Sequence, residues 1–190
     1  MPRHFPHKTI LALLATAACQ TYAADPSSQG GVLNGDFEKG TIGYWKDGKV
    51  SKAAISQTAH TGKHALALGP ERAMCGQTVP IIPDSRYRLS AWVRTEAGAE
   101  EVQLMASNFG GVKMSVSSAL TDYKEIGLEF VTAHTAKEVL ITLIHPGGPG
   151  KGYVDDVKLT RLGDAPPPVV EEFMKAIPRH IEEEGGAAQQ

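Results

Sequence analysis

The sequence predicts an all-β protein in which two antiparallel sheets pack as a sandwich or close into a barrel. Between residues 32 and 162, short runs of alternating apolar and polar residues are interrupted by Gly, Pro, Asn and Asp. This pattern is typical of strands joined by tight turns. No helical periodicity interrupts these runs, so alternating strands and helices around a parallel sheet are not expected.

The alternation is clearest in residues 86–94, where Trp92 lies on the outward side beside Arg88, Ser90 and Arg94. Similar alternation predicts strands near residues 102–107, 125–130, 139–143 and 155–159. The last of these places Asp155 on the inward side, with Val157 and Leu159. The Gly- and Pro-rich residues 146–150 cannot form regular structure and are expected in a surface loop between the last two strands.

The N-terminus has the pattern of a secretory signal. A basic start precedes an apolar run at residues 10–18, and small residues flank Tyr22 at the expected cleavage site after Ala23. The run is only about half of the roughly 20 residues that a membrane span needs, and no later segment is suitable. A buried N-terminal helix is the alternative. We therefore expect residues 1–23 to be removed and the protein to be secreted or periplasmic, with residues 24–31 as a flexible leader.

Two cysteines bear on this interpretation. Cys19 follows the apolar run, so a lipid anchor at Cys19 is a minority alternative, although Thr16 stands where such sites usually have Leu. Cleavage after Ala23 would leave Cys75 as the single cysteine of the mature chain. No intramolecular disulfide is then possible, and stability must come from an ordinary core.

The C-terminus changes character after Leu162. Residues 163–168 are a Pro-rich linker, and residues 169–190 are predicted to be helical and then disordered. Apolar residues recur at spacings of three and four, and Pro178 should kink or end the helix. A short helix with this stripe should dock on a surface, which makes it a possible protein contact. The stripe comprises Val169, Val170, Phe173, Ile177 and Ile181.

Three motifs occur in the order found in one family of domains. They are Asn34-Gly35-Asp36-Phe37-Glu38 followed by Trp45, Thr61-Gly62-Lys63-His64-Ala65-Leu66, and Tyr153-Val154-Asp155-Asp156-Val157-Lys158-Leu159. Between them, residues 77–79 and 87–93 match the family's middle strands. Over residues 32–162 the sequence resembles the jelly-roll carbohydrate-binding modules of families 4, 9, 16 and 22. The resemblance implies two stacked antiparallel sheets, often with a structural calcium ion and a glycan site.

The resemblance also implies that the first and last strands run together at one edge. Asp36 and Glu38, expected on the first strand, would then approach Asp155, with backbone carbonyls near Gly62 and Lys63. Calcium prefers six to eight oxygen ligands of these kinds. A structural Ca²⁺ held by Asp36, Glu38, Lys63 and Asp155 is therefore expected, and solvated or salt-bridged edge acids are the alternative.

Aromatic residues are few, so each is informative. Sugar rings stack on Trp and Tyr, and outward Trp92 is the leading candidate. Gln103, Met105 and Ser107 are expected to flank it; coverage of Trp92 by a loop or by the C-terminal helix is the alternative. Trp45 is expected to pack into the sandwich edge. The full set of candidate ligand-binding residues is Trp92, Arg88, Arg94, Gln103, Tyr44, Asn108 and Phe109.

Several function classes are disfavoured. The net charge is −2 and the basic residues are scattered, which argues against nucleic acid as a partner. The histidines have no recognised zinc spacing. No nucleophile or metalloprotease motif is visible. Adjacent Asp155 and Asp156 would point to opposite faces of a strand, so they cannot form the facing acid pair of a glycosidase.

The sequence therefore predicts an exported, non-catalytic glycan-binding protein, with a polysaccharide or oligosaccharide as partner. The main alternative is a structural or protein-binding envelope domain that has this fold and no sugar site. A polysaccharide-degrading enzyme is a remote third possibility. Exposure of the sheet face that carries Trp92 should separate the first two.

Overall fold

The computed structural model of the chain describes residues 31–47 and 51–166. These residues form nine strands and no helix, so the predicted all-β class is confirmed. The predicted C-terminal helix lies outside the described residues, as do the signal sequence and Cys19. Within the described residues no helix could cross a membrane.

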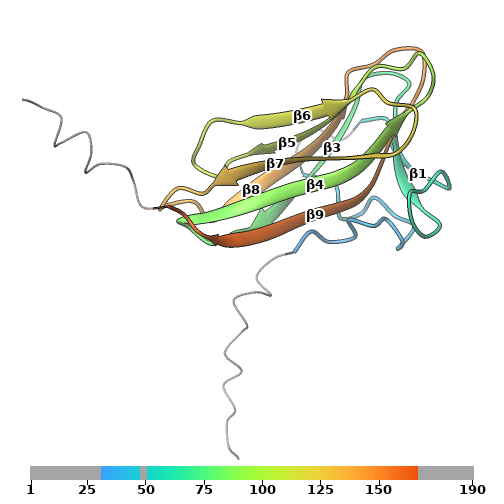
Figure 1. Cartoon of the computed structure of the whole chain (residues 1–190). Helices are drawn as coiled ribbons and strands as arrows, with labels where there is room; N and C mark the ends of the chain where they lie inside the picture. Colours follow the sequence, from blue (N-terminus) through green and yellow to red (C-terminus); the bar gives the residue numbers. More distant parts are fainter. Residues whose placement is uncertain (1–30, 48–50, 167–190) are drawn as a thin grey trace, which may run out of the picture.

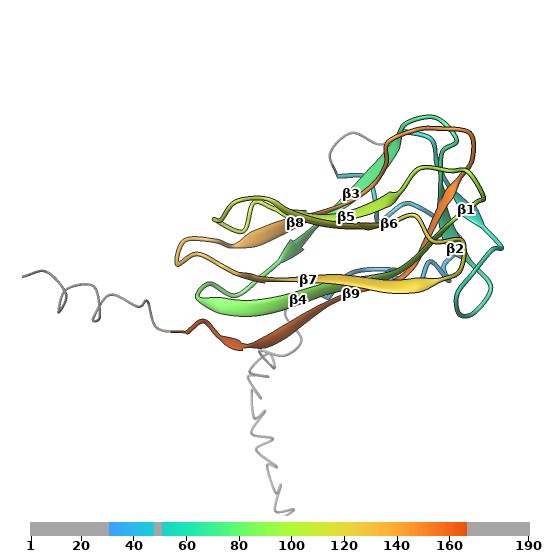
Figure 2. The same ribbon diagram turned by 45° about the horizontal axis from the view of Figure 1, so that its top comes forward.

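Two antiparallel sheets lie face to face (Figures 1 and 2). The five-stranded sheet has the order β1-β2-β9-β4-β7 and the four-stranded sheet the order β3-β8-β5-β6. The strands are β1 (Ala53–Ser56), β2 (Ala65–Leu68), β3 (Ala73–Pro80), β4 (Ser85–Thr95), β5 (Val102–Ser107), β6 (Met114–Ser118), β7 (Lys124–Val131), β8 (Glu138–His145) and β9 (Gly152–Asp164).

The core lies between the sheets because alternate residues of each strand turn inward. In β4 the inward residues Tyr87, Leu89, Ala91 and Val93 are at most 5% exposed. They face the inward residues of β3, β5 and β8 across the sandwich, in one apolar cluster. Residues 146–150 connect β8 to β9, as predicted.

The first motif does not form a strand, which corrects the expectation for Asp36 and Glu38. Asn34 and Phe37 have φ angles of 52° and 54°, so this segment is a run of turns. The turns bury Phe37 and Trp45 completely, and the Trp45 indole N–H donates to the Asn34 carbonyl at 3.2 Å. Trp45 is therefore structural, as predicted.

Gly35 joins this segment to β9. Its carbonyl accepts a hydrogen bond of 2.9 Å from the Val157 amide. A Cβ atom at Gly35 would lie 2.2 Å from the Val157 carbonyl oxygen, so no larger residue fits without movement of the backbone. The close approach explains why glycine stands at this position of the motif.

A bulge in β9 changes which side chains share a face. Ser90 pairs with Lys158 and Trp92 with Asp155, so β9 has one residue more than β4 between these pairs. Asp156 is the extra residue and has a φ of 49°. Val154 and Val157 consequently both point into the core, and Asp155 points outward beside Trp92. The predicted inward position of Asp155 is wrong for this reason.

Candidate functional site

Trp92 lies near the middle of the outer face of the five-stranded sheet. The register places it between Glu125 on β7 and Asp155 on β9. Its indole is partly exposed, whereas Asp155 is completely buried. Something above the sheet must therefore cover Asp155.

The cover is the loop of residues 57–64 between β1 and β2, which we call the strap. The Asp155 carboxylate accepts hydrogen bonds from the His60 and Thr61 amides at 2.9 and 3.1 Å. Its other oxygen accepts from the Asp156 amide at 2.8 Å. Burial raises the pKa of Asp155, although these three donors favour the charged form.

Asp156 and Glu38 hold the same strap from two sides. Asp156 contacts the His60 imidazole and accepts from the Thr61 hydroxyl, both at 2.9 Å. Glu38 accepts from the Lys63 and His64 amides, both at 2.8 Å. Burial opposes ionisation of Asp156, but its bonds to His60 and Thr61 outweigh that effect and lower its pKa. The two backbone amide donors lower the pKa of Glu38.

The strap also contacts Trp92. The His60 imidazole stacks on the indole, with ring centroids 3.8 Å apart and planes 11° apart. The Tyr123 ring lies 5.4 Å from His60, and its hydroxyl donates to the Thr58 carbonyl at 2.6 Å. One face of Trp92 is therefore occupied by the protein itself.

Arg94 belongs to the covered part of this face. Its guanidinium carbon lies 5.9 Å from the Tyr123 ring centroid and 5.8 Å from that of Tyr153. Tyr153 donates its hydroxyl hydrogen to Glu96 at 2.6 Å. Arg94 therefore supports the aromatic cluster beneath the strap.

The strap leaves the neighbouring part of the sheet uncovered. We call this part the polar shelf, and it consists of Arg88, Ser90, Trp92, Glu125, Gly127 and Lys158; Ser90 is buried among its neighbours, and the other residues are exposed or partly exposed. Arg88 lies 4.0 Å from Glu125 and 3.9 Å from Glu129, and these three side chains are 45–50% exposed. Such exposed ion pairs contribute little to stability, so their polar atoms can exchange partners.

The structure separates the other candidate ligand-binding residues from Trp92. Gln103, with Met105 and Ser107, lies on β5 in the four-stranded sheet, so the expectation that they flank Trp92 is wrong. Phe109 is 3% exposed and packs on Phe130 in the core, with ring centroids 4.5 Å apart, so its ring is not a loop contact for a ligand.

Two candidate residues are exposed, at other places on the domain. Tyr44 is 38% exposed and its hydroxyl accepts from the Lys39 ammonium at 3.1 Å. Asn108 is exposed in the loop between β5 and β6. Neither belongs to the polar shelf.

The residues expected to bind calcium do not form a preassembled cage. Glu38 and Asp155 each accept hydrogen bonds from strap amides, and exposed Asp36 accepts from the Glu38 amide at 3.3 Å. Among the described residues no three His, Cys, Asp or Glu side chains converge as a metal site. Calcium binding stays a prediction.

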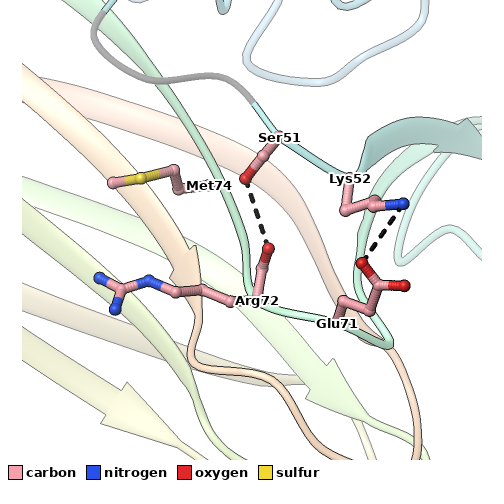
Figure 3. A pocket seen from close by; sticks show the side chains of 5 residues that line it. All are labelled: Ser51, Lys52, Glu71, Arg72 and Met74. Carbon is pink, nitrogen blue, oxygen red and sulfur yellow. Dashed lines mark hydrogen bonds and ion pairs between the residues drawn. The ribbon is translucent and has the colours of Figure 1, made fainter.

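A surface pocket lies at the edge of β3. It has a volume of about 500 Å³ and is lined by Ser51, Lys52, Glu71, Arg72 and Met74 (Figure 3). Lys52 forms an ion pair with Glu71 at 3.3 Å, and the Ser51 hydroxyl donates to the Arg72 carbonyl (Figure 3). The pocket adjoins the four-stranded sheet through Met74 and is separate from the polar shelf.

Sequence reasoning did not identify His60, Asp156 and Tyr123 as partners in one cluster. His60 and Tyr123 lie outside the predicted strands, and their approach to Trp92 depends on how two loops fold over the sheet. The Thr61-Gly62 turn was the available signal that this loop reverses direction. It does not show that the loop covers the sheet.

Two stacked antiparallel sheets with a partly open polar face define a small β-sandwich of the jelly-roll type. The sequence profile of the family described as "Carbohydrate binding domain" matches residues 29–149, which is more than half of the chain. The chain belongs to this family.

One curated protein is similar in sequence to this chain. The chain is 27% identical over 131 residues to Exochitinase 1 of Streptomyces olivaceoviridis; the match covers 68% of this chain and 21% of that enzyme. It therefore spans about a fifth of the enzyme's length.

Two solved structures show the same fold. A family 16 carbohydrate-binding module matches with a TM-score of 0.60 and 19% identity, covering 68% of this chain and 98% of the module. The module TmCBM61, solved with β-1,4-galactotriose, matches with a TM-score of 0.56 and 24% identity, covering 68% and 97%.

Proposed function

We propose that this chain is an exported, non-catalytic glycan-binding protein and that the polar shelf beside Trp92 is its binding surface. Membership of the carbohydrate-binding domain family supports the class of ligand. The observation that carries the location is the partly exposed Trp92, which borders an uncovered row of polar side chains.

The shelf offers complementary chemistry to a sugar. His60 backs one face of the indole, so a sugar ring would meet the other face or the edge of Trp92. Arg88 and Lys158 can donate hydrogen bonds to hydroxyl oxygens, and Glu125 can accept them from hydroxyl hydrogens. The Arg88 guanidinium lies over Gly127, where a Cβ atom would be 3.2 Å from Arg88 Nη2, so the glycine lets Arg88 lie close to the sheet.

The expected affinity is modest. One aromatic platform and a few hydrogen bonds leave little surplus after a flexible glycan is ordered. Dissociation constants between about 1 μM and 1 mM correspond to roughly −8 to −4 kcal/mol.

The test compares Trp92→Ala with Tyr44→Ala, which removes an exposed aromatic ring outside the shelf. A glycan array identifies a ligand for the unmodified protein, and calorimetric titration measures affinity. Trp92→Ala should weaken binding at least about tenfold, and Tyr44→Ala should change it by less than about twofold. Equal losses, or full affinity in a folded Trp92→Ala protein, would rule out the shelf as the site.

Non-catalytic binding has its own test. Incubation of the purified protein with the bound polysaccharide should release no reducing ends above a boiled control. Accumulating reducing ends would instead support the remote alternative of a degrading enzyme.

A second function is favoured by one observation. His60 covers one face of Trp92, as expected of a domain that retains the fold as a structural or protein-binding envelope component. If no glycan on a broad array binds the folded protein, this second function replaces the first.

Export and calcium binding are further parts of the proposal. Mass spectrometry of the product from its native host should find an N-terminus at Ala24, whereas a lipidated Cys19 would indicate a membrane anchor. Calcium should raise the melting temperature of the unmodified protein and not that of Asp155→Ala. Equal melting temperatures with calcium and with chelator would exclude the structural ion.

A further inference from the structure

The edge strands of the two sheets differ in how their free backbone is protected. An open edge can pair with a strand of another molecule, so proteins usually protect edges with charged residues, covering segments or very short strands. In the five-stranded sheet, the edge strand β1 is only four residues long. The opposite edge strand, β7, carries Lys124, Glu125 and Glu129. Both edges of this sheet are therefore protected.

The β3 edge of the four-stranded sheet is covered by the chain that precedes it. Ser51 and Met74 exchange two backbone hydrogen bonds of 2.9 and 3.0 Å. Farther along β3, the Asp47 amide donates to the Gly76 carbonyl at 3.0 Å. The Asp47 carboxylate accepts a hydrogen bond from the Thr78 amide. Several backbone groups of β3 that point away from β8 are therefore already bonded.

β6, the other edge strand of this sheet, has no such cover. It pairs with β5 alone, and within the part of the chain that the structure describes no backbone hydrogen bond joins Met114–Ser118 to a segment on the other side. The strand contains neither a charged residue nor proline, and it lies along the margin of its sheet (Figure 1). The chain runs without a turn from Val112 to Leu120, and both of these residues are more than half exposed. Free backbone beside exposed apolar side chains suits the addition of a further strand.

We propose that β6 pairs antiparallel with β6 of a second copy of this chain, in a register centred on Val116. This register pairs all five residues of the strand and makes one continuous sheet from the two four-stranded sheets. A two-fold axis relates the copies, so one patch serves as both halves of the interface. Met114 then lies opposite Ser118 of the second copy, and Ser115 lies opposite its Ser117.

A charged group held over β6 favours a second copy as the added strand. The Glu101 carboxylate accepts hydrogen bonds from the Ser117 hydroxyl at 2.7 Å and from the Gln103 side-chain amide at 2.6 Å. These two donors lower the pKa of Glu101, so the carboxylate is charged at neutral pH. A negative charge beside the free edge attracts a strand that brings a positive charge to the same place.

Lys113 brings that charge in the proposed register. Ser117 lies opposite Ser115 of the second copy, and exposed Lys113 stands two residues before Ser115 on the same face. Diagonal neighbours on paired strands are about 7–8 Å apart, a distance that a lysine side chain spans. Lys113 of each copy therefore reaches Glu101 of the other, and the dimer has two such ion pairs.

The centre of the pairing is apolar. Val116 packs against the core of its own sandwich and remains partly exposed. On the two-fold axis it lies opposite Val116 of the second copy, and side chains directly opposite each other are about 4.5–5.5 Å apart and interact. The apolar layer beneath the sheet would therefore continue from one copy into the other.

The pairing also determines how the two copies are oriented. The two-fold axis of an antiparallel pair is perpendicular to the sheet, so the outer faces of both five-stranded sheets point the same way. With the proposed function, on which this consequence rests, the two polar shelves lie on one side of the dimer. One polysaccharide surface then engages both, which raises the overall affinity without a new contact.

Charge reversal tests the pairing, with sedimentation equilibrium of the full chain as the measurement. The paired edge is smaller than a standard interface, so a dimer dissociation constant between about 1 μM and 1 mM is expected. Glu101→Lys and Lys113→Glu each make both ion pairs repulsive and should raise this constant at least about tenfold. The double variant, and an equimolar mixture of the two single variants, should restore it because each Lys again meets a Glu.

The design separates contact between copies from effects within one copy. Glu101 lies by Ser117 and Lys113 precedes Met114, so the two charges lie toward opposite ends of β6 in the same chain. Restoration in the mixture therefore reports an intermolecular contact. The matched control Lys137→Glu makes the same charge change in the loop between β7 and β8 and should alter the constant less than about twofold. Melting temperatures check that every variant remains folded.

Nuclear magnetic resonance tests the register. In a mixture of isotope-labelled and unlabelled copies, filtered spectra should show nuclear Overhauser contacts between the Val116 methyl groups of the two copies. Amide hydrogen exchange in β6 should slow as the protein concentration rises, because pairing protects the free edge.

Three results would overturn the proposal. The first is a full chain that stays monomeric up to about 1 mM, which would leave the β6 edge to another protein or to none. The second is a dimer whose dissociation constant does not respond to the single reversals, or is not restored in the mixture. The third is contact between copies at Ile55 of β1 instead of Val116. None of these outcomes depends on glycan binding, which the array tests separately.

Discussion

Replacement of Asp155 by alanine should release the strap. The substitution leaves the amide N–H groups of His60, Thr61 and Asp156 without their acceptor. At about 1 kcal/mol for each lost hydrogen bond, the gross cost is about 3 kcal/mol. Burial disfavours the charged carboxylate and offsets part of this cost, so a net loss of about 2 kcal/mol is expected.

The loss should be visible in thermal unfolding. For a domain of this size, about 2 kcal/mol corresponds to a fall of roughly 6–8 °C in melting temperature. Asp155→Asn keeps one acceptor oxygen and should fall about half as far. Tryptophan fluorescence adds a local readout, because His60 stacks on Trp92 while Trp45 is buried elsewhere. An Asp155→Ala protein with unchanged melting temperature and fluorescence would refute this account of the strap.

Three other substitutions or treatments test separate parts of the structure. Gly35→Ala should cost about 3 kcal/mol because its Cβ would clash with the Val157 carbonyl, whereas Gly31→Ala, with nothing within 4 Å, should melt like the unmodified protein. The raised pKa of Asp155 means that the folded state binds more protons than the unfolded state just above pH 3.8, so this group makes stability fall as pH rises. The stability that Asp155→Asn loses relative to the unmodified protein should therefore shrink between pH 4 and pH 7. A constant difference in urea titrations would contradict this prediction. Burial raises the pKa of Cys75 to about 12. A thiol reagent should therefore modify Cys75 at least about a hundredfold more slowly in the native protein than in urea. Similar rates in the two states would show that this part of the core opens.

Much of the fold could be predicted because side chains on a strand alternate with a period of two. The inward row of Tyr87, Leu89, Ala91 and Val93 follows from spacing alone, and it forms the centre of the core. The same rule failed at Asp155, because a bulge at Asp156 shifts the alternation by one residue. An Asp with a positive φ leaves no clear mark in an alternating pattern.

The candidate site was harder to predict because it depends on strand order and on loop paths. Trp92, Arg88 and Ser90 share a face since they share a strand. Gln103 was assigned to the same face, but β5 belongs to the other sheet, and strand order is set by contacts distant in sequence. Phe109 follows Asn108 in a loop pattern, yet its ring enters the core because the loop folds back toward Phe130.

The strap has a consequence for aggregation as well as for stability. β1 is the edge strand of its sheet, and β2 joins β9 through only three backbone pairs, at Leu66, Ala67 and Leu68. The carboxylates of Glu38, Asp155 and Asp156 fasten the loop of this hairpin over the sheet. Release of the hairpin would uncover the backbone of β9 at Gly152, Tyr153 and Val154, and an unpaired strand edge is a template for strands of other molecules. By holding the hairpin in place, Glu38, Asp155 and Asp156 oppose intermolecular β-pairing at this edge. Strongly acidic conditions protonate Glu38 and Asp156, whose lowered pKa values show that the fold favours their charged forms, and should therefore make the domain prone to form β-rich aggregates.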